Sequence, residues 1–188
     1  MILFGIILFF IAFFVLKKWF HKRAIQKRYQ NYEKEVAVHV EKWKGWEQNG
    51  IPTIESKHLI MDKGEDLLAS VMFRMRVGES RKTDEGILHI TNTRFLFTSM
   101  GNVNQIPYDK IVSVMACHEY ILITPDKKGK MLQFVPITET IEELRLTLAD
   151  VYAMWFLLNR GKYSEMEENI LSILGVCKVV TTEQVPNE

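Results

Sequence analysis

The first twenty residues constrain this chain more than any other segment. Residues 1–16 read MILFGIILFFIAFFVL, an uncharged and almost wholly apolar run, and Lys17 and Lys18 follow it directly. As a helix, this run spans roughly 24 Å, and Trp19 and Phe20 extend it toward the roughly 30 Å of a bilayer's hydrocarbon core. We therefore expect residues 1–20 to form a transmembrane anchor.

Two alternatives to an uncleaved anchor can be weighed from the residues on either side of the run. A cleaved secretory signal has basic residues before its apolar core and small residues at the cleavage site. No basic residue precedes this run, and Lys-Lys-Trp-Phe follows it. A helix buried in a protein core is the second alternative, and the uncleaved anchor fits the sequence best.

Six basic residues follow the apolar run and form what we call the basic collar. Basic residues beside a membrane span stay on the cytoplasmic side, so the sequence predicts a single-pass protein of the cell or inner membrane with a cytoplasmic C-terminal part. The collar either contacts anionic lipid headgroups, at about 1 kcal/mol per residue, or only sets the topology. The collar consists of Lys17, Lys18, Lys22, Arg23, Lys27 and Arg28.

The rest of the chain is net acidic, which bears on its partners. Residues 29–188 contain 18 basic and 23 acidic residues. A nucleic-acid-binding protein needs a basic surface to neutralise phosphates, so we expect no nucleic-acid partner. Cys117 and Cys177 are far apart and belong to no metal-binding motif, so we expect reduced thiols and no metal or cofactor.

Residues 22–48 show the apolar spacing of a helical stalk, which Asn49-Gly50-Ile51-Pro52 should end. The stalk either packs on the protein's own domain or pairs with a second copy as a short coiled coil. Trp43 and Trp46 are candidates for ordinary core packing or for a groove that binds a protein partner. The expected apolar stripe consists of Ile25, Tyr29, Tyr32, Val36, Val40 and Trp43.

From about Leu67 the apolar period changes from helical spacing to alternation, which is typical of strands. Seven short strands without intervening helices predict an antiparallel sandwich or partly open barrel. Thr140 and Glu143 fit a capping box for a following amphipathic helix, which should pack against the strands. A short helix from about Ser164 to Gly175 should follow. The expected strands begin near 67, 86, 94, 104, 111, 120 and 131.

The central strands resemble those of GRAM domains and bacterial PH-like domains. The resemblance covers about residues 58–160, with Gly64-Glu65 ahead of the first strand. It implies the seven-stranded pleckstrin-homology fold capped by a C-terminal helix, and an adaptor or lipid-contacting module. It rests on Gly86-x-Leu88-x-Ile90-Thr91-Asn92-x-Arg94-Phe95-x-Phe97 and Ile106-x-Tyr108-x-x-Ile111-x-Ser113-Val114.

Within this motif we expect structural roles for most side chains. Leu88, Ile90, Phe95 and Phe97 should face the core. Asn92 should serve the turn, and Arg94 should pair with a nearby carboxylate or cap backbone carbonyls.

Two basic turns are further candidates for lipid contact, because clustered Lys and Arg side chains bind phosphate oxygens. Arg81 and Lys82 lie in the first hairpin, where Glu79, Asp84 and Glu85 largely cancel their charge. Lys127 and Lys128 lie in a later turn. In both places a solvated turn is the simpler interpretation.

No catalytic motif is present, and the five histidines lack metal-ligand spacing, so we do not expect an enzyme. The sequence predicts a membrane-anchored PH/GRAM-like adaptor with an unknown protein partner; a subunit of a larger membrane assembly and a lipid-headgroup sensor are the alternatives. The expected parts are an anchor (1–20), collar and stalk (21–48), linker (49–57), PH/GRAM-like domain (58–161), and short helix with polar tail (162–188).

Overall fold

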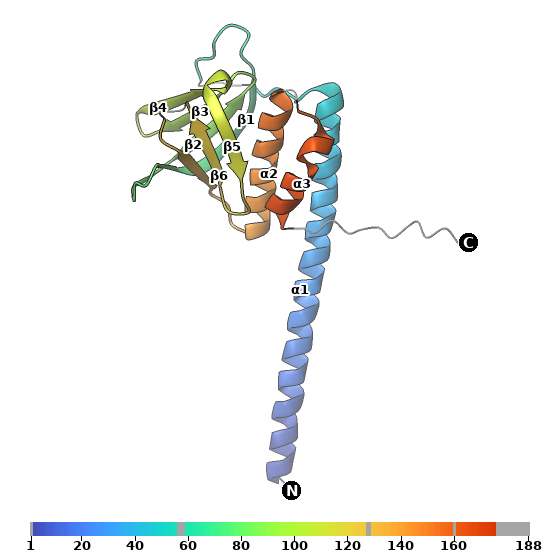
Figure 1. The fold of residues 1–188 in the computed structure, drawn as a ribbon. Coiled ribbons are helices and arrows are strands. Elements are labelled where there is room, and N and C mark those ends of the chain that lie inside the picture. Colours follow the sequence, from blue (N-terminus) through green and yellow to red (C-terminus); the bar gives the residue numbers. More distant parts are fainter. Residues whose placement is uncertain (1, 56–58, 127–128, 160, 176–188) are drawn as a thin grey trace, which may run out of the picture. The chain divides into compact units, whose positions relative to one another are not determined.

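The computed structural model describes residues 2–55, 59–126, 129–159 and 161–175, with side chains from Leu16 onward. The chain divides into two compact units, Met1–Val40 and Glu41–Glu188. Figure 1 labels the helices and strands along the chain.

One continuous helix, α1, covers Ile2–Asn49, so the predicted anchor and stalk are parts of the same element. It ends where the sequence predicted: Gly50 has a positive φ of 83°, and its amide donates to the Trp46 carbonyl at 2.9 Å. Among the residues whose side chains are described, no helix combines the length and the apolar character needed to cross a bilayer. Most of the predicted anchor, residues 1–15, lies outside that set.

The predicted apolar stripe of the stalk is buried only in part. Tyr32, Val36 and Trp43 are buried, whereas Ile25 and Tyr29 are more than half exposed. Helical spacing shows which residues share a face, but not where along the helix that face is covered.

The strands form one seven-stranded antiparallel sheet with the order β4-β3-β2-β1-β7-β6-β5, curled into a half-barrel (Figure 1). Of the two predicted architectures, the partly open barrel is the one observed. The central pairing of β1 with β7 joins the first strand to the last. The strands are β1 (Leu67–Val77), β2 (Thr83–Thr91), β3 (Arg94–Ser99), β4 (Asn102–Pro107), β5 (Ile111–Ala116), β6 (Ile121–Pro125) and β7 (Leu132–Pro136).

The concave side of the sheet holds an aromatic core. The rings of Phe73 and Phe97 each contact Phe134 edge-on, with centroids 6.1 and 5.7 Å apart. All three side chains are fully buried, as are Leu88 and Ile90. Phe95 is fully buried as well, so the predicted core positions of the motif are confirmed.

Two helices follow the sheet: α2 (Ile141–Leu158), which contacts β5 and β7, and α3 (Tyr163–Leu174), which packs on α2. Thr140 caps α2 as the sequence predicted, since the Glu143 amide donates to Thr140 Oγ1 at 3.2 Å. The second bond of the predicted capping box differs: Glu143 Oε2 accepts from the amide of Glu139, one residue before the cap, at 3.3 Å. Gly175, in the left-handed conformation, ends α3 as predicted. The helix starts at Tyr163, one residue before the predicted start.

The last turns of α1 belong to the second unit and pack on α2. Both oxygens of the Asp150 carboxylate are used: Trp43 Nε1 donates to Oδ1 and Lys42 Nζ to Oδ2, each at 2.7 Å. The Tyr163 amide at the start of α3 donates to Glu47 Oε2 at 3.3 Å. These contacts join the last turns of α1 to α2 and α3 within the second unit.

Candidate functional site

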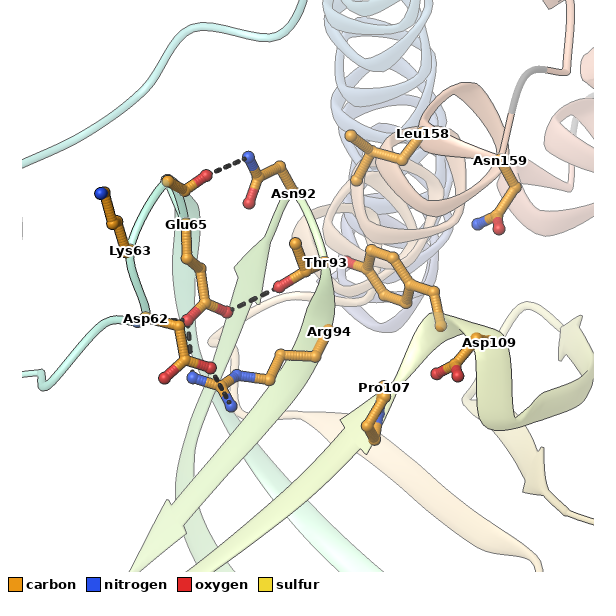
Figure 2. A pocket seen from close by; sticks show the side chains of 12 residues that line it. Asp62, Lys63, Glu65, Asn92, Thr93, Arg94, Pro107, Asp109, Leu158 and Asn159 are labelled. Atoms are coloured by element: carbon orange, nitrogen blue, oxygen red, sulfur yellow. Dashed lines mark hydrogen bonds and ion pairs between the residues drawn. The ribbon is translucent and has the colours of Figure 1, made fainter.

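An open hollow of about 600 Å³ lies where the β2–β3 turn meets the segment before β1 and the C-terminal end of α2 (Figure 2). Most of the residues that line it are polar, and they include both acidic and basic side chains. The lining residues are Asp62, Lys63, Gly64, Glu65, Asn92, Thr93, Arg94, Pro107, Tyr108, Asp109, Leu158 and Asn159.

The floor of this hollow is an ion pair between Glu65 and Arg94. Arg94 Nη2 donates to Glu65 Oε2 at 2.6 Å, and the Glu65 side chain is only 1% exposed. On the other side of the guanidinium, Nη1 lies 3.0 Å from Asp62 Oδ2 and donates to Gln105 Oε1 at 2.9 Å. The carboxylate partner that the sequence predicted for Arg94 is therefore Glu65, with Asp62 as a second.

The β2–β3 turn supplies further donors to the same carboxylate. Thr91 and Thr93 hydroxyls donate to Glu65 Oε1 at 2.7 and 2.9 Å, and the Asp62 amide donates to Oε2 at 3.0 Å. Figure 2 shows the Glu65, Asp62 and Arg94 side chains converging below the turn. The Glu65 carboxylate thus accepts hydrogen bonds from four groups.

Asn92 also holds the segment that carries Glu65, through its backbone and its side chain, as expected of a turn residue. We call this arrangement of Thr91, Asn92, Thr93 and Arg94 around Glu65 the clamp. Its Oδ1 accepts from the Asp66 amide at 3.1 Å, and its Nδ2 donates to the Gly64 carbonyl at 3.2 Å. Its own amide donates to the Asp66 carbonyl at 3.1 Å. The turn therefore fixes the chain segment that carries Glu65.

The electrostatics of Glu65 favour the ionised carboxylate. Burial by itself raises the pKa of this carboxyl, but the hydrogen bonds from Asp62, Thr91, Thr93 and Arg94 together outweigh it, and the pKa lies below its ordinary value. Burial, and after it the Glu65 charge, strongly raises the pKa of Tyr108, whose hydroxyl donates to the Thr91 carbonyl at 2.7 Å. A carboxylate of this kind suits a structural clamp better than proton transfer, which needs a pKa near the working pH.

A second polar cluster, which sequence reasoning missed, centres on His89 in β2. Its Nδ1 lies 2.8 Å from Ser70 Oγ on β1, and its Nε2 lies 3.0 Å from Thr98 Oγ1 on β3. Burial lowers the pKa of His89, which favours the neutral imidazole. Only the strand register reveals this cluster, because Ser70 pairs with His89 across β1 and β2.

The predicted lipid-contacting residues are exposed wherever the structure describes them. The six collar residues lie on α1 in the first unit, and the Arg23 guanidinium lies 4.1 Å from the centroid of the Trp19 ring. Arg81 and Lys82 lie together in the β1–β2 connection of the second unit. Beside them Arg74 Nε donates to Glu85 Oε1 at 2.8 Å, which ties up one of the nearby basic groups. Lys127 and Lys128 lie outside the described residues.

The two tryptophans of the predicted partner groove lie in different environments. Trp43 is fully buried and hydrogen-bonded to Asp150, so it acts as a core residue. Trp46 is half-buried, with the Lys42 ammonium 5.0 Å from its ring centroid. Of the pair, only Trp46 has surface left for a partner, and the groove stays a prediction. Among the described residues, no group of three or more His, Cys, Asp and Glu side chains is placed to hold a metal ion.

The chain matches no protein-family model and no curated protein sequence. Among solved structures it is similar to the C-terminal domain of an unknown protein from Leishmania infantum, at 18% sequence identity and a TM-score of 0.40. That similarity covers 50% of this chain and 86% of the Leishmania chain.

Proposed function

We propose that this chain is a membrane-tethered PH/GRAM-like binding module that works at the cytoplasmic face through contacts with another protein. The observation that carries the proposal is the uncharged apolar run of residues 1–16, followed at once by the basic collar. Helix α1 continues from this run without a break into the unit that holds the half-barrel. A tether of this kind keeps a binding module near the bilayer.

Two features of the half-barrel favour the PH/GRAM-like assignment within this proposal. The sheet has seven antiparallel strands and is followed by the amphipathic helix α2. The motif residues also have distinct structural roles: Leu88 and Phe97 fill the core, whereas Asn92 and Arg94 build the clamp around Glu65.

The charge distribution favours a protein partner over a specific lipid headgroup. Residues 29–188 are net acidic, and the basic side chains near the first hairpin lie among carboxylates such as Glu85, which pairs with Arg74. A headgroup site instead gathers several Lys or Arg side chains around one phosphate. The collar remains the part best suited to non-specific contact with anionic lipids.

The chemistry of the two polar clusters supports a binding role over catalysis. Glu65 is held ionised by four donors, so it is a poor general acid or base. Ser70 and His89 are within hydrogen-bonding distance, but a threonine hydroxyl occupies the place behind His89 where an activated serine needs a carboxylate.

The tether is tested by fractionating cells that express the full chain or a chain beginning at Lys17. We expect the full chain to stay with membranes through alkaline carbonate washing, and the shortened chain to become extractable. The basic collar is present in both chains, so a difference in extraction is due to the apolar run. Full-length protein in the soluble fraction would contradict the proposal.

The choice of a protein partner is tested by vesicle flotation of residues 41–188, the compact second unit. This fragment keeps Trp43 and α3, which are part of its core. We expect no flotation with neutral, phosphatidylserine or phosphoinositide vesicles. Flotation with phosphoinositide vesicles alone, abolished by changing Arg81 and Lys82 to Ser, would make the domain a headgroup sensor and overturn the proposed mode of action.

A further inference from the structure

An exposed apolar row crosses the convex face of the sheet, opposite the aromatic core. It takes one residue from each of β1, β2, β3 and β4, and these residues pair with one another across the strands: Met72, Ile87, Thr98 and Val103. Residues opposite each other on neighbouring strands point to the same face, and alternate residues, such as Phe73, fill the core. Val103 is more than half exposed, and Met72 and Ile87 are each more than a third exposed. A contiguous exposed row of this kind is typical of a contact surface.

Polar pairs border this row on both sides. Arg74 of β1 lies opposite Glu85 of β2, and both side chains are more than half exposed. On the other side of the row, Ser70 lies opposite His89, with Ser70 Oγ 2.8 Å from His89 Nδ1. An apolar centre with a polar rim is the usual anatomy of a contact between proteins.

The pattern of this surface fits a second copy of the same surface. A two-fold axis that runs parallel to the strands, between β1 and β2, exchanges these two strands. Such an axis places Met72 of one copy against Ile87 of the second copy, and Arg74 against Glu85 in both directions. Two sheets that pack face to face keep their strands within about 30° of each other, which preserves this correspondence. We propose that two copies of this chain pair through their convex sheet faces, with the contact centred on Met72 and Ile87.

The ion pair at the rim has groups left for the second copy. Within one copy, Arg74 Nε donates to Glu85 Oε1 at 2.8 Å. In the part of the chain that the structure describes, no other hydrogen bond is made by the Arg74 guanidinium or the Glu85 carboxylate. Arg74 Nη1 and Nη2 can therefore donate to Glu85 Oε2 of the second copy. The resulting ring of alternating charges suits a second copy better than a partner whose surface carries one sign of charge.

The inference goes beyond the proposed function and does not rest on it, because neither the tether nor another protein takes part in this pairing. A failure of the pairing would leave the proposed function standing, and the reverse is also true.

Charge reversal tests the pairing in the full chain, purified in a neutral detergent and measured by sedimentation equilibrium with the detergent matched in density. We expect a monomer–dimer equilibrium that Arg74→Glu and Glu85→Arg each weaken by about tenfold or more, because like charges then meet. An equal mixture of the two variants should restore the dimer, since a wholly acidic rim then meets a wholly basic one. Both side chains are more than half exposed, so each variant should unfold at the temperature of the unaltered chain.

Two outcomes of this experiment would overturn the proposal. The first is a monomer at every concentration. The second is a dimer that neither reversal weakens, or that the mixture fails to restore, which would move the contact to another surface such as α1.

Two methionines of similar exposure test the apolar centre of the contact. Met72 is 47% exposed within the row, and Met131 is 49% exposed beside Gly78, beyond the end of β1. Met72→Lys should weaken the dimer by about tenfold or more, whereas Met131→Lys should weaken it by about twofold or less. Equal weakening by the two substitutions would contradict a contact centred on this row.

Discussion

Glu65 and Arg94 form a deeply buried ion pair. They lie 29 positions apart in sequence and meet at 2.6 Å, with the carboxylate side chain almost wholly buried. Removing one partner of such a pair leaves a buried charge without its compensating partner. Breaking the pair is therefore expected to destabilise the fold mainly because one unpaired charge remains buried.

We predict that Arg94→Met destabilises residues 41–188 by about 3 kcal/mol, because Glu65 loses its strongest donor. The free energy of unfolding in urea measures the change. Arg74→Met is the matched control: its ion pair with Glu85 is more than half exposed, so the expected cost is below about 1 kcal/mol. Equal losses of stability for the two substitutions would contradict the prediction that the buried Glu65–Arg94 pair matters more than the exposed Arg74–Glu85 pair.

The lowered pKa of Glu65 predicts an acid dependence of stability. The folded pKa lies below the ordinary value of 4.5, so the unfolded chain binds more protons between these two values. The stabilising contribution is complete above about pH 5 and is lost as the pH falls through the folded pKa. Urea unfolding between pH 6 and pH 3 should show a smaller loss of stability for Glu65→Gln than for the unaltered chain. An equal loss of stability for the two chains across this pH range would contradict the lowered pKa of Glu65.

At the scale of the elements, β2 and β3 can lie close together because Gly86 has no side chain. Gly86 pairs with Ser99, and a Cβ atom there would overlap the Thr98 carbonyl oxygen and lie 2.8 Å from Phe97 Cζ. Both neighbours are held by the sheet and the core, so the strands themselves would have to move. This explains the glycine that opens the strand motif.

We predict that Gly86→Ala destabilises the domain by about 2 kcal/mol or more, because the added methyl group overpacks a fixed strand pair. Thermal unfolding of residues 41–188 measures the effect. Gly45→Ala in α1 is the control, since a Cβ there meets nothing within 4 Å. Alanine favours helix over glycine, so this control should be neutral or slightly stabilising. A neutral Gly86→Ala variant would contradict the close approach.

At the scale of the whole molecule, one carboxylate joins two segments of the second unit that are far apart in sequence. Asp150 of α2 holds Lys42 and Trp43 of α1, more than 100 positions earlier in the sequence. Trp43 is fully buried beneath these bonds. The second unit therefore includes the last turns of α1.

We predict that Asp150→Ala loosens the end of α1 more than it unfolds the sheet. Both donors lose a charged acceptor, and the buried Trp43 indole N–H loses its hydrogen bond to Asp150, at a cost of about 2 kcal/mol. Hydrogen exchange should rise in residues 41–49 and much less in β2. Asp150→Asn keeps an oxygen for Trp43 and should have a smaller effect. Uniform exchange changes across the domain would contradict this local role.

Features that depend only on neighbouring residues could be predicted from the sequence. Gly50 and Gly175 ended helices, Thr140 with Glu143 began one, and alternation located all seven strands. It also placed Leu88 and Phe97 in the core, because strand side chains alternate between two faces. These signals depend on residues within one or two helical turns or a few strand positions, so they can be recognised before the fold is known.

Contacts between distant segments could not be predicted from the sequence and follow from the folded arrangement. It selected Glu65 as the partner of Arg94 and brought Ser70 beside His89. It also left Ile25 and Tyr29 exposed although they continue the apolar stripe of Tyr32. The physical reason is that strand register and packing partners depend on the free energy of the whole chain. A local pattern shows that a residue prefers to be buried, but not which other residues will bury it.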